Sequence, residues 1–262
     1  MELGIAGRTA VVTGAGRGIG LAITRALVDE GARVVAGSRE VTAELGELTA
    51  DGRVVAVAVD LAEPTGPAEL IAAATATFGG LDILVNNVGA VRPRTGGFLT
   101  VTDDDWDATL SVNFLAAVRT TRAALPILLD RGAGSIVTVS SVNAFLPDPL
   151  VIDYGAAKAA LSNFCKALSK EIGPRGIRVN TVSPGPVATA LWIGRSGVAA
   201  TVARAAGGTA DDVARQAAAD AATGRFTRPE EVADLVVYLA GDRAANITGS
   251  DFTIDGGLVT TL

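Results

Sequence analysis

Short runs of β-branched and other apolar residues recur along the chain, separated by longer segments rich in alanine and leucine. Several of these runs are apolar throughout, which is typical of strands buried on both faces of a parallel sheet. The expected strands are 9–13, 33–36, 54–59, 83–86, 135–140, 178–182 and 252–254. The segments between them, such as 20–30 and 102–129, have the length and composition of helices. This alternation predicts an α/β fold, with one doubly wound Rossmann-type domain over 1–262 and a mostly parallel seven-stranded sheet covered by helices on both faces.

The segment 188–225 departs from this alternation. It is rich in alanine and glycine and follows Pro184-Gly185-Pro186. A long excursion at such a point is either a mobile lid over a site or an ordinary helical insertion, and we favour a substrate lid.

Composition and charge argue against nucleic-acid binding and against a membrane span. The net charge is −6 and no basic run stands out, so nucleic acid is not an expected partner. No stretch approaches the roughly 18 uninterrupted apolar residues of a membrane span, and the opening residues lack the layout of a signal peptide. A single cysteine, Cys165, excludes an internal disulfide and fits a reducing cytoplasm.

The chain contains no histidine. A Ser-His-Asp triad and a histidine-ligated metal site are therefore impossible, and we expect no metal. Proton transfer at neutral pH must come from a carboxylate, a lysine, a tyrosine or the lone cysteine.

A glycine-rich turn lies between the first expected strand and the first expected helix. It reads Thr13-Gly14-Ala15-Gly16-Arg17-Gly18-Ile19-Gly20. Glycines at such a turn let the backbone approach a pyrophosphate, which then rests on the helix N-terminus. The spacing TGxxxGxG differs from the common GxGxxG, and loops also collect glycine for conformational reasons alone. Its position after the first strand favours cofactor binding, with Thr13, Gly14, Arg17, Gly18, Ile19 and Gly20 as the candidate residues.

The end of the second strand bears on the choice of nucleotide. An acid about 20 residues beyond the glycines would hold the ribose 2′-hydroxyl of NAD. Here the strand ends in Ser38 and Arg39, and Arg17 adds a second guanidinium in the glycine turn. Arginine suits a 2′-phosphate, so NADP(H) is favoured over NAD(H), although both arginines could simply be solvated.

Tyr154 and Lys158 are four residues apart near the start of an expected helix, which puts them on one face. An unperturbed tyrosine has a pKa near ~10, and a neighbouring ammonium favours the phenolate and lowers that value. The pair is therefore a candidate acid–base centre. The same spacing is frequent on ordinary helices, so the pair alone does not identify a site.

Several further motifs accompany this pair along the whole chain. They are the glycine turn, Asn86-Asn87-Val88-Gly89, Asn113, Ser141, Tyr154-x3-Lys158, Arg178-Val179-Asn180, Ser183-Pro184-Gly185 and Asp255-Gly256-Gly257. In order and separation they resemble the short-chain dehydrogenase/reductase family in its single-domain form. Val88 departs from the family's usual alanine.

The resemblance implies four catalytic roles. Tyr154 would exchange a proton with the substrate oxygen, and Lys158 would depress its pKa and hydrogen-bond the nicotinamide ribose. Ser141 would orient and polarise the carbonyl, with Ser140 as its competitor. Asn113 would hold a water that links Lys158 to solvent.

The resemblance also implies cofactor contacts. Asp60 and Leu61 would contact the adenine, and Asn87 and Gly89 would line the adenosine-ribose side, whereas Asn86 would brace strands. The nicotinamide would be held by Pro184, Gly185, Val187 and Thr189.

The implied activity is hydride transfer between NADP(H) and a ketone or secondary alcohol, as in carbonyl reductases and ketoreductases, with thioesters among the substrates. An NAD-dependent alcohol dehydrogenase and a non-catalytic, nucleotide-binding redox sensor are the alternatives. Family habit implies a homotetramer or a dimer.

Other features have a structural interpretation. Cys165 is expected to be a buried thiol, and the acids 103–105 are expected to open a helix. Arg92 and Arg94 are expected in a solvated loop rather than facing an anionic substrate. Trp192 could pack over substrate or against its own segment.

Overall fold

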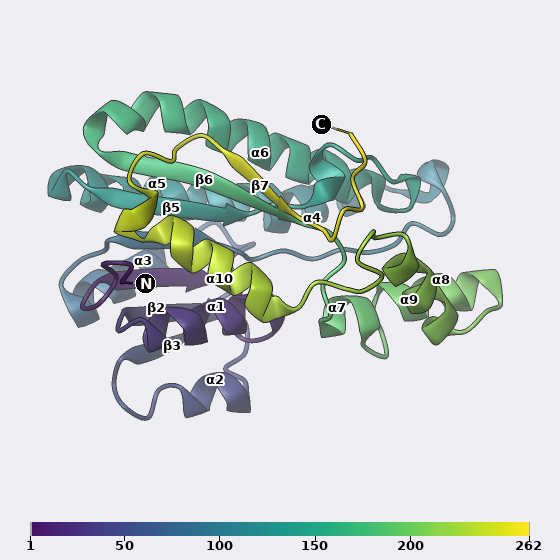
Figure 1. Cartoon of the computed structure of the whole chain (residues 1–262), viewed down its shortest axis with the longest axis horizontal. Helices are drawn as coiled ribbons and strands as arrows, with labels where there is room; N and C mark the ends of the chain where they lie inside the picture. Colours follow the sequence, from purple (N-terminus) through teal and green to yellow (C-terminus); the bar gives the residue numbers. More distant parts are fainter. Residues whose placement is uncertain (1, 262) are drawn as a thin grey trace.

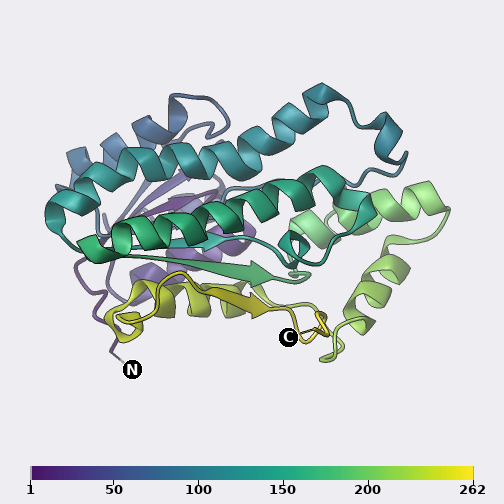
Figure 2. The same ribbon diagram turned by 90° about the horizontal axis from the view of Figure 1, so that it is seen from above.

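The computed structural model describes residues 2–261 and forms a seven-stranded sheet with helices on both faces (Figures 1 and 2). Neighbouring strands all pair in parallel, in the order β3-β2-β1-β4-β5-β6-β7. The strands are β1 (Thr9–Thr13), β2 (Arg33–Ser38), β3 (Val54–Ala58), β4 (Ile83–Asn86), β5 (Gly134–Val139), β6 (Ile177–Pro184) and β7 (Asp251–Ile254). The predicted doubly wound architecture is confirmed.

Helices cover the sheet in two layers, with α1 and α10 on one face and α3, α5 and α6 on the other. The helices are α1 (Gly18–Asp29), α2 (Ala43–Glu47), α3 (Gly66–Phe78), α4 (Asp103–Leu110), α5 (Ala116–Arg131), α6 (Ile152–Ile172), α7 (Ala190–Ile193), α8 (Val198–Ala206), α9 (Ala210–Ala219) and α10 (Pro229–Ala240). Short 3₁₀ turns are η1 (Phe98–Thr100), η3 (Val142–Ala144), η4 (Pro149–Val151), η5 (Gly173–Arg175) and η6 (Asp242–Ala244), and η2 (Ser111–Leu115) is a π-turn.

The central strands are mainly apolar because both of their faces are buried. Val12 and Val34 belong to the core beneath α1 and α10, whereas Val11 and Val35 belong to the core beneath α3, α5 and α6. All four valines are fully buried, and each such burial stabilises the fold by about 1.5–3 kcal/mol. Successive side chains of a strand point to opposite faces, so a polar residue here needs a hydrogen-bond partner, as Asn86 has in Thr121.

The expected helix over 102–129 is confirmed, with an irregular π segment in its middle. Thr102 and Asp105 form a capping box that opens α4, as the acids 103–105 predicted. The π-turn η2 then separates α4 from α5. The continuous stretch Asp103–Arg131 has the length and apolar composition of a membrane span. In the fold it packs against α3, α6 and the sheet.

The carboxyl edge of the sheet opens between β1 and β4, because the chain leaves these neighbouring strands toward opposite faces. The segment 188–225 lies beyond this edge as α7, α8 and α9 (Figure 2). Its two ends are joined by a parallel bridge between Val187 and Thr227. The segment is thus a helical cover whose two ends are held together by this bridge. Its motion as a lid stays a prediction.

Candidate active site

A cavity of about 1080 Å³ runs from the glycine turn to the cover formed by α7–α9. Most of the predicted site residues lie on its wall. These are Gly14, Arg17, Gly18, Ile19, Gly20, Ser38, Arg39, Asp60, Leu61, Asn87, Gly89, Ser141, Tyr154, Lys158, Pro184, Gly185, Val187 and Thr189. Thr13 and Asn113 are the exceptions, since both are buried behind the wall.

The glycine turn needs its glycines for both conformation and space. Gly14 and Gly18 have φ angles of +68° and +55°, which favour glycine. A Cβ on Gly14 would lie 2.9 Å from the Cα of Val88, and one on Gly20 would lie 2.2 Å from the Gly14 carbonyl oxygen. Arg17, at the N-cap of α1, makes no side-chain capping bond. The N–H groups at this end of α1 therefore suit the pyrophosphate of a dinucleotide.

Thr13 supports the turn from beneath. Its Oγ1 accepts hydrogen bonds from the backbone N–H of Asn87 (2.8 Å) and Val88 (3.0 Å) and donates to the Val85 carbonyl (3.2 Å). The Asn87 amide donates in return to the Thr13 carbonyl at 2.9 Å. These bonds tie the end of β1 to the end of β4. Thr13 therefore shapes the cavity without lining it.

Asn86 braces the neighbouring elements, as expected. Its Nδ2 donates to Thr121 Oγ1 at 3.0 Å and to Thr138 Oγ1 at 3.5 Å. Val88, the departure from the family pattern, packs partly against the core beneath α3, α5 and α6. The larger side chain is therefore accommodated.

At the end of β2 the wall carries Ser38, Arg39 and Glu40. The Ser38 hydroxyl donates to the Glu40 carbonyl at 2.6 Å, and Thr42 donates to the Gly16 carbonyl at 2.7 Å. These two bonds hold the 38–42 loop against the glycine turn. Glu40 was missed by the sequence analysis, because the acid was sought at the strand end and not two residues later.

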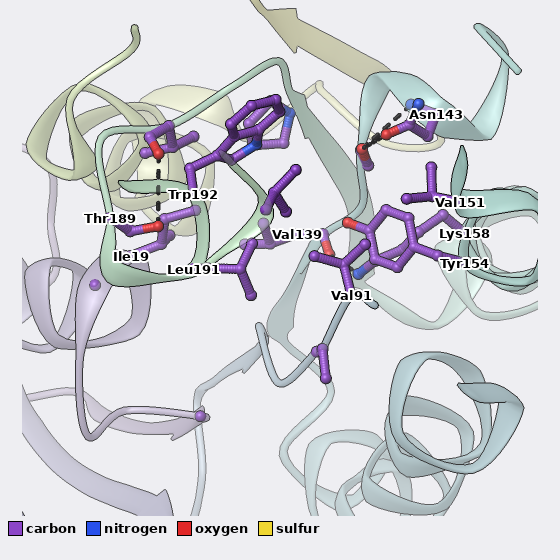
Figure 3. Close-up of a pocket in the computed structure, with 18 of the residues that line it drawn as sticks. Ile19, Val91, Val139, Asn143, Val151, Tyr154, Lys158, Thr189, Leu191 and Trp192 are labelled. Carbon is purple, nitrogen blue, oxygen red and sulfur yellow. Dashed lines mark hydrogen bonds between the residues drawn. The ribbon is translucent and has the colours of Figure 1, made fainter. Parts of the chain in front are cut away.

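Lys158 is buried one turn after Tyr154 on α6, with 3% of its surface exposed. Its Nζ donates to the Val139 carbonyl at 2.9 Å and lies 5.7 Å from the centroid of the Tyr154 ring (Figure 3). Burial lowers the pKa of the Lys158 ammonium to about 8.

The pKa of Tyr154 moves opposite to the expected direction. Burial raises the pKa of the phenol above its usual value, and the Ser141 hydroxyl offsets this only in part. The sequence analysis predicted a lowered pKa from the Lys158 ammonium. Desolvation dominates instead, while the ammonium hydrogen-bonds the backbone of β5.

Ser140 and Ser141 differ in their hydrogen-bond partners. Ser140 Oγ is 2.7 Å from Ser162 Oγ on α6. Ser141 caps the turn η3, where its Oγ accepts from the Asn143 backbone N–H at 3.2 Å and donates to Asn143 Oδ1 at 3.4 Å. Together with its effect on the Tyr154 pKa, this placement favours Ser141 over Ser140 beside the phenol.

Asn113 lies in the π-turn η2, a type of helix irregularity frequent at functional sites. Its Oδ1 accepts from the Ala90 N–H at 3.0 Å, and its Nδ2 donates to the carbonyls of Ala90 (2.9 Å) and Thr109 (3.0 Å). A Cβ on Gly89 would lie 3.0 Å from Asn113 Oδ1 and 3.6 Å from Lys158 Nζ. Gly89 therefore lets the loop after β4 pass close to both side chains.

Arg94 is not solvated, which corrects the sequence prediction. Its side chain is 8% exposed and is ion-paired with Asp153, which directly precedes Tyr154, and with Asp105 at 2.8 Å. Thr109 also donates to Asp153, at 2.7 Å. Burial alone would raise the pKa of the Asp153 carboxyl, but Arg94 and Thr109 together hold it below its usual range. Arg92 is exposed, as expected.

The far wall comes from elements that carry no recognisable motif. Trp192 packs against Phe226, with ring centroids 5.4 Å apart, and also lines the cavity. Trp192 thus packs against the residue that directly follows its own segment, and its packing over substrate stays a prediction. Asn143 and Leu191 also lie on this wall. The position of Asn143, two residues after Ser141, was the one signal in the sequence that could have indicated it.

Cys165 fits a structural role. Cys165 is buried, as expected. Burial raises the pKa of its thiol to about 11. Within residues 2–261, no three carboxylate or thiol side chains gather as they would around a metal ion.

Comparisons with known proteins show which proteins this chain resembles. A family model described as enoyl-(acyl carrier protein) reductase matches residues 14–259. The chain is 36% identical over 252 residues to the short-chain reductase protein NovJ of Streptomyces niveus, covering 95% of this chain and 92% of the relative. It is 32% identical to the 3-oxoacyl-[acyl-carrier-protein] reductase FabG of Salmonella typhimurium, covering 96% and 97%.

Solved structures agree with the sequence relatives. L-sorbose reductase of Gluconobacter frateurii, complexed with NADPH and L-sorbose, superposes over 100% of both chains with a TM-score of 0.91 and 36% identity. With a family model over nearly the whole chain and relatives of this similarity, the chain belongs to the short-chain dehydrogenase/reductase family of nicotinamide-dependent oxidoreductases.

Proposed function

We propose that this chain transfers a hydride between NADP(H) and a ketone or secondary alcohol, and that it works as a carbonyl reductase at neutral pH. One observation carries the proposal. Ser141, Tyr154 and Lys158 lie on the wall of the same cavity as the glycine turn at the N-terminus of α1. A nucleotide bound at the turn and a substrate oxygen at Tyr154 would therefore share one enclosed space.

The residues around the glycine turn fit a nicotinamide dinucleotide. The uncapped end of α1 would hold its pyrophosphate, and Asp60, Leu61 and Asn87 would line the adenosine side. Pro184, Gly185, Val187 and Thr189 would hold the nicotinamide end. When bound, this cofactor supplies or accepts the hydride.

The preference for NADP(H) rests on Ser38, Arg39 and Arg17, which face the cavity where a 2′-phosphate would lie. Glu40 on the same wall favours the alternative, an NAD(H)-dependent alcohol dehydrogenase, because a carboxylate can hold the 2′-hydroxyl. The guanidiniums of Arg17 and Arg39 can each give a phosphate charge-assisted hydrogen bonds, which favours NADP(H).

The protonated state of Tyr154 supports reduction as the neutral-pH direction. At pH 7 the phenol keeps its proton, which is the form that donates to a carbonyl oxygen as hydride arrives at carbon. Ser141 would hold the same oxygen with a second hydrogen bond. Alcohol oxidation requires the phenolate as base, so its rate should rise with pH.

Lys158 and Asn113 would act behind the phenol. Lys158 would hydrogen-bond the nicotinamide ribose and favour the phenolate in the oxidation direction. Asn113 fixes the loop around Ala90 through two hydrogen bonds and is itself held by a third to the Thr109 carbonyl. Its role in holding a water between Lys158 and solvent stays a prediction.

Cofactor choice is tested first. We expect kcat/KM with NADPH to exceed that with NADH by at least about tenfold, since each charge-assisted hydrogen bond contributes about 1.5–3 kcal/mol. Adenosine 2′,5′-bisphosphate should bind more tightly than AMP. The double variant Ser38→Asp, Arg39→Ala should reverse both preferences. A wild-type preference for NADH together with weaker binding of the bisphosphate would establish the NAD(H) alternative.

Catalysis is tested with Tyr154→Phe. The variant should bind NADPH like the wild type and lose about 10²–10⁴-fold in ketone reduction. Retained turnover would exclude Tyr154 as the proton donor. Nucleotide binding with no turnover in the wild type itself would instead support the redox-sensor alternative.

Thioesters belong to the proposed substrate range, and we expect a cytoplasmic homotetramer or dimer. Light scattering coupled to size-exclusion chromatography measures the assembly. A monomer at micromolar concentration would refute that part of the proposal.

A further inference from the structure

Charge is divided between the two ends of the cavity. The two guanidiniums on its wall, Arg17 and Arg39, lie at the glycine turn and at the end of β2. We define the substrate wall as the cavity-lining residues within 91–93, 142–151 and 190–220, together with Leu258. The ionisable side chains of this substrate wall are two carboxylates, Asp148 and Asp220. Glu40 and Asp60 also line the nucleotide end, so the two ends differ in that only the nucleotide end has guanidiniums to hold an anion.

No arginine of the segments that form the substrate wall lines the cavity: Arg195, Arg204 and Arg215 lie off it, as do Arg92 and Arg94. Arg94 is buried between Asp153 and Asp105. Arg92 has a side chain that is 75% exposed, pairs with Asp105 at 3.3 Å, and does not line the cavity. Among the described residues of the substrate wall there is thus no cation to bind a substrate carboxylate or phosphate.

The rest of the substrate wall is apolar. Val91 lies beside the Tyr154 phenol, and Leu191 and Trp192 lie across the cavity from it (Figure 3). Leu146 and Leu191 are 39% and 45% exposed. Large apolar side chains left exposed around a cavity are a feature of ligand-binding sites. Phe226 packs on Trp192 and holds that ring in place.

The few polar side chains of the substrate wall already have partners within their own segments. Asn143 donates to the Leu146 carbonyl at 3.2 Å and accepts from Ser141. Asp148 accepts from the Leu150 N–H at 2.9 Å, and Asp220 accepts from Gln216 at 2.8 Å. Hydroxyls spread over a substrate would lose water here and find few replacements, which weakens binding.

From this wall we infer the substrate class, an inference that rests on the proposed function. The substrate is a ketone or secondary alcohol, and the part of it that contacts the substrate wall is uncharged and has the reacting oxygen as its main polar group. A ring or branched hydrocarbon group attached to the carbonyl carbon packs against Leu191 and Trp192. Polyhydroxylated ketones and 3-oxo acids are poor substrates.

The test uses pairs of ketones of similar shape with NADPH and the wild-type enzyme. Cyclohexanone is compared with inosose, its polyhydroxylated counterpart, and ethyl benzoylacetate is compared with the benzoylacetate anion. We expect kcat/KM to be at least about tenfold higher for the apolar or uncharged member of each pair, the size of effect that one misplaced group has in an apolar pocket. A preference for inosose or for the anion would overturn the substrate class while leaving hydride transfer established.

If no ketone is turned over, the proposed function fails and the substrate class is judged by binding. The same pairs are then titrated into the NADPH-loaded protein by calorimetry. Tighter binding of cyclohexanone and of the ester retains the inference. Equal or weaker binding overturns it.

Variants of the wall supply a second test. Leu191→Gln should lower kcat/KM for cyclohexanone by about tenfold without changing the Kd of NADPH. Leu99→Gln is the matched control, because Leu99 is 96% exposed and lies off the cavity. Asp220→Asn should raise the ratio of anion to ester turnover several-fold. Equal effects of the two leucine variants would exclude Leu191 from substrate binding.

Discussion

Removing the Arg94 guanidinium should destabilise the protein strongly. The Asp153 side chain is 2% exposed, and its Oδ2 accepts from Arg94 Nε at 3.1 Å and from Thr109 Oγ1 at 2.7 Å. Its Oδ1 has no hydrogen-bond partner among the described residues. In Arg94→Met a buried carboxylate would keep a single neutral donor.

The expected magnitudes differ between the two partners. Breaking a buried ion pair by removing one partner costs about 3–5 kcal/mol, and we expect Arg94→Met to fall in this range. Asp153→Asn leaves Arg94 paired with Asp105 at 2.8 Å, so its cost should be lower, about 1–3 kcal/mol. Arg92→Met is the matched control, because an exposed pair contributes about 0–1 kcal/mol.

The destabilisation should depend on pH in a defined direction. In the wild type the pKa of Asp153 is below its usual value. The pair's stabilisation is therefore present above the unfolded pKa of about 3.9 and is lost as pH falls through the folded pKa. In Arg94→Met burial acts without its counterion and raises the pKa of Asp153. Protonation then removes the buried charge. The difference in the free energy of unfolding between wild type and Arg94→Met should therefore become smaller from pH 7 to pH 5.

Urea unfolding at one protein concentration measures these free energies by linear extrapolation. The reasoning fails if Arg94→Met lies within about 1 kcal/mol of wild type at pH 7, the range of an exposed pair. It also fails if the gap widens toward pH 5.

Three further predictions concern the buried site and its surroundings. The pKa of Lys158 is about 8 in the folded chain and about 10.4 unfolded. The unfolded chain therefore binds more protons between these values, and stability should rise with pH across this window by up to about 1.4 kcal/mol per unit; Lys158→Met should lack this slope in urea titrations. Gly89→Ala should lower kcat/KM by at least about tenfold. The added methyl group would press against Asn113 Oδ1 and displace it, and such overpacking costs about 1–3 kcal/mol. Its control Gly46→Ala, where a Cβ meets nothing within 4 Å, should leave kcat/KM unchanged. Cys165, with a thiol pKa of about 11, should react with Ellman's reagent at pH 8 only after unfolding, and rapid reaction of the native protein would contradict its burial.

The secondary structure and part of the candidate site could be predicted from local pattern. All seven strands were predicted near their observed bounds, because β-branched and other apolar residues cluster in each and burial on both faces makes the central runs nearly continuous. The turn containing Gly14 and Gly18 was predicted because positive φ angles and close backbone approach restrict the residue type. The four-residue spacing of Tyr154 and Lys158 places them on one helix face whatever surrounds them.

Other features depend on residues far apart in the sequence, and only the tertiary structure decided them. Arg94 is buried because α4 and α6 bring Asp105 and Asp153 to it, and no local pattern distinguishes it from the exposed Arg92. The raised pKa of Tyr154 follows from desolvation by its surroundings, whereas sequence spacing reports only its charged neighbour. The apolar substrate wall is likewise assembled from separate loops. Local pattern thus determined the backbone elements and the reactive side chains, while the three-dimensional packing determined their electrostatic environment, because burial and long-range contacts set the cost of each charge.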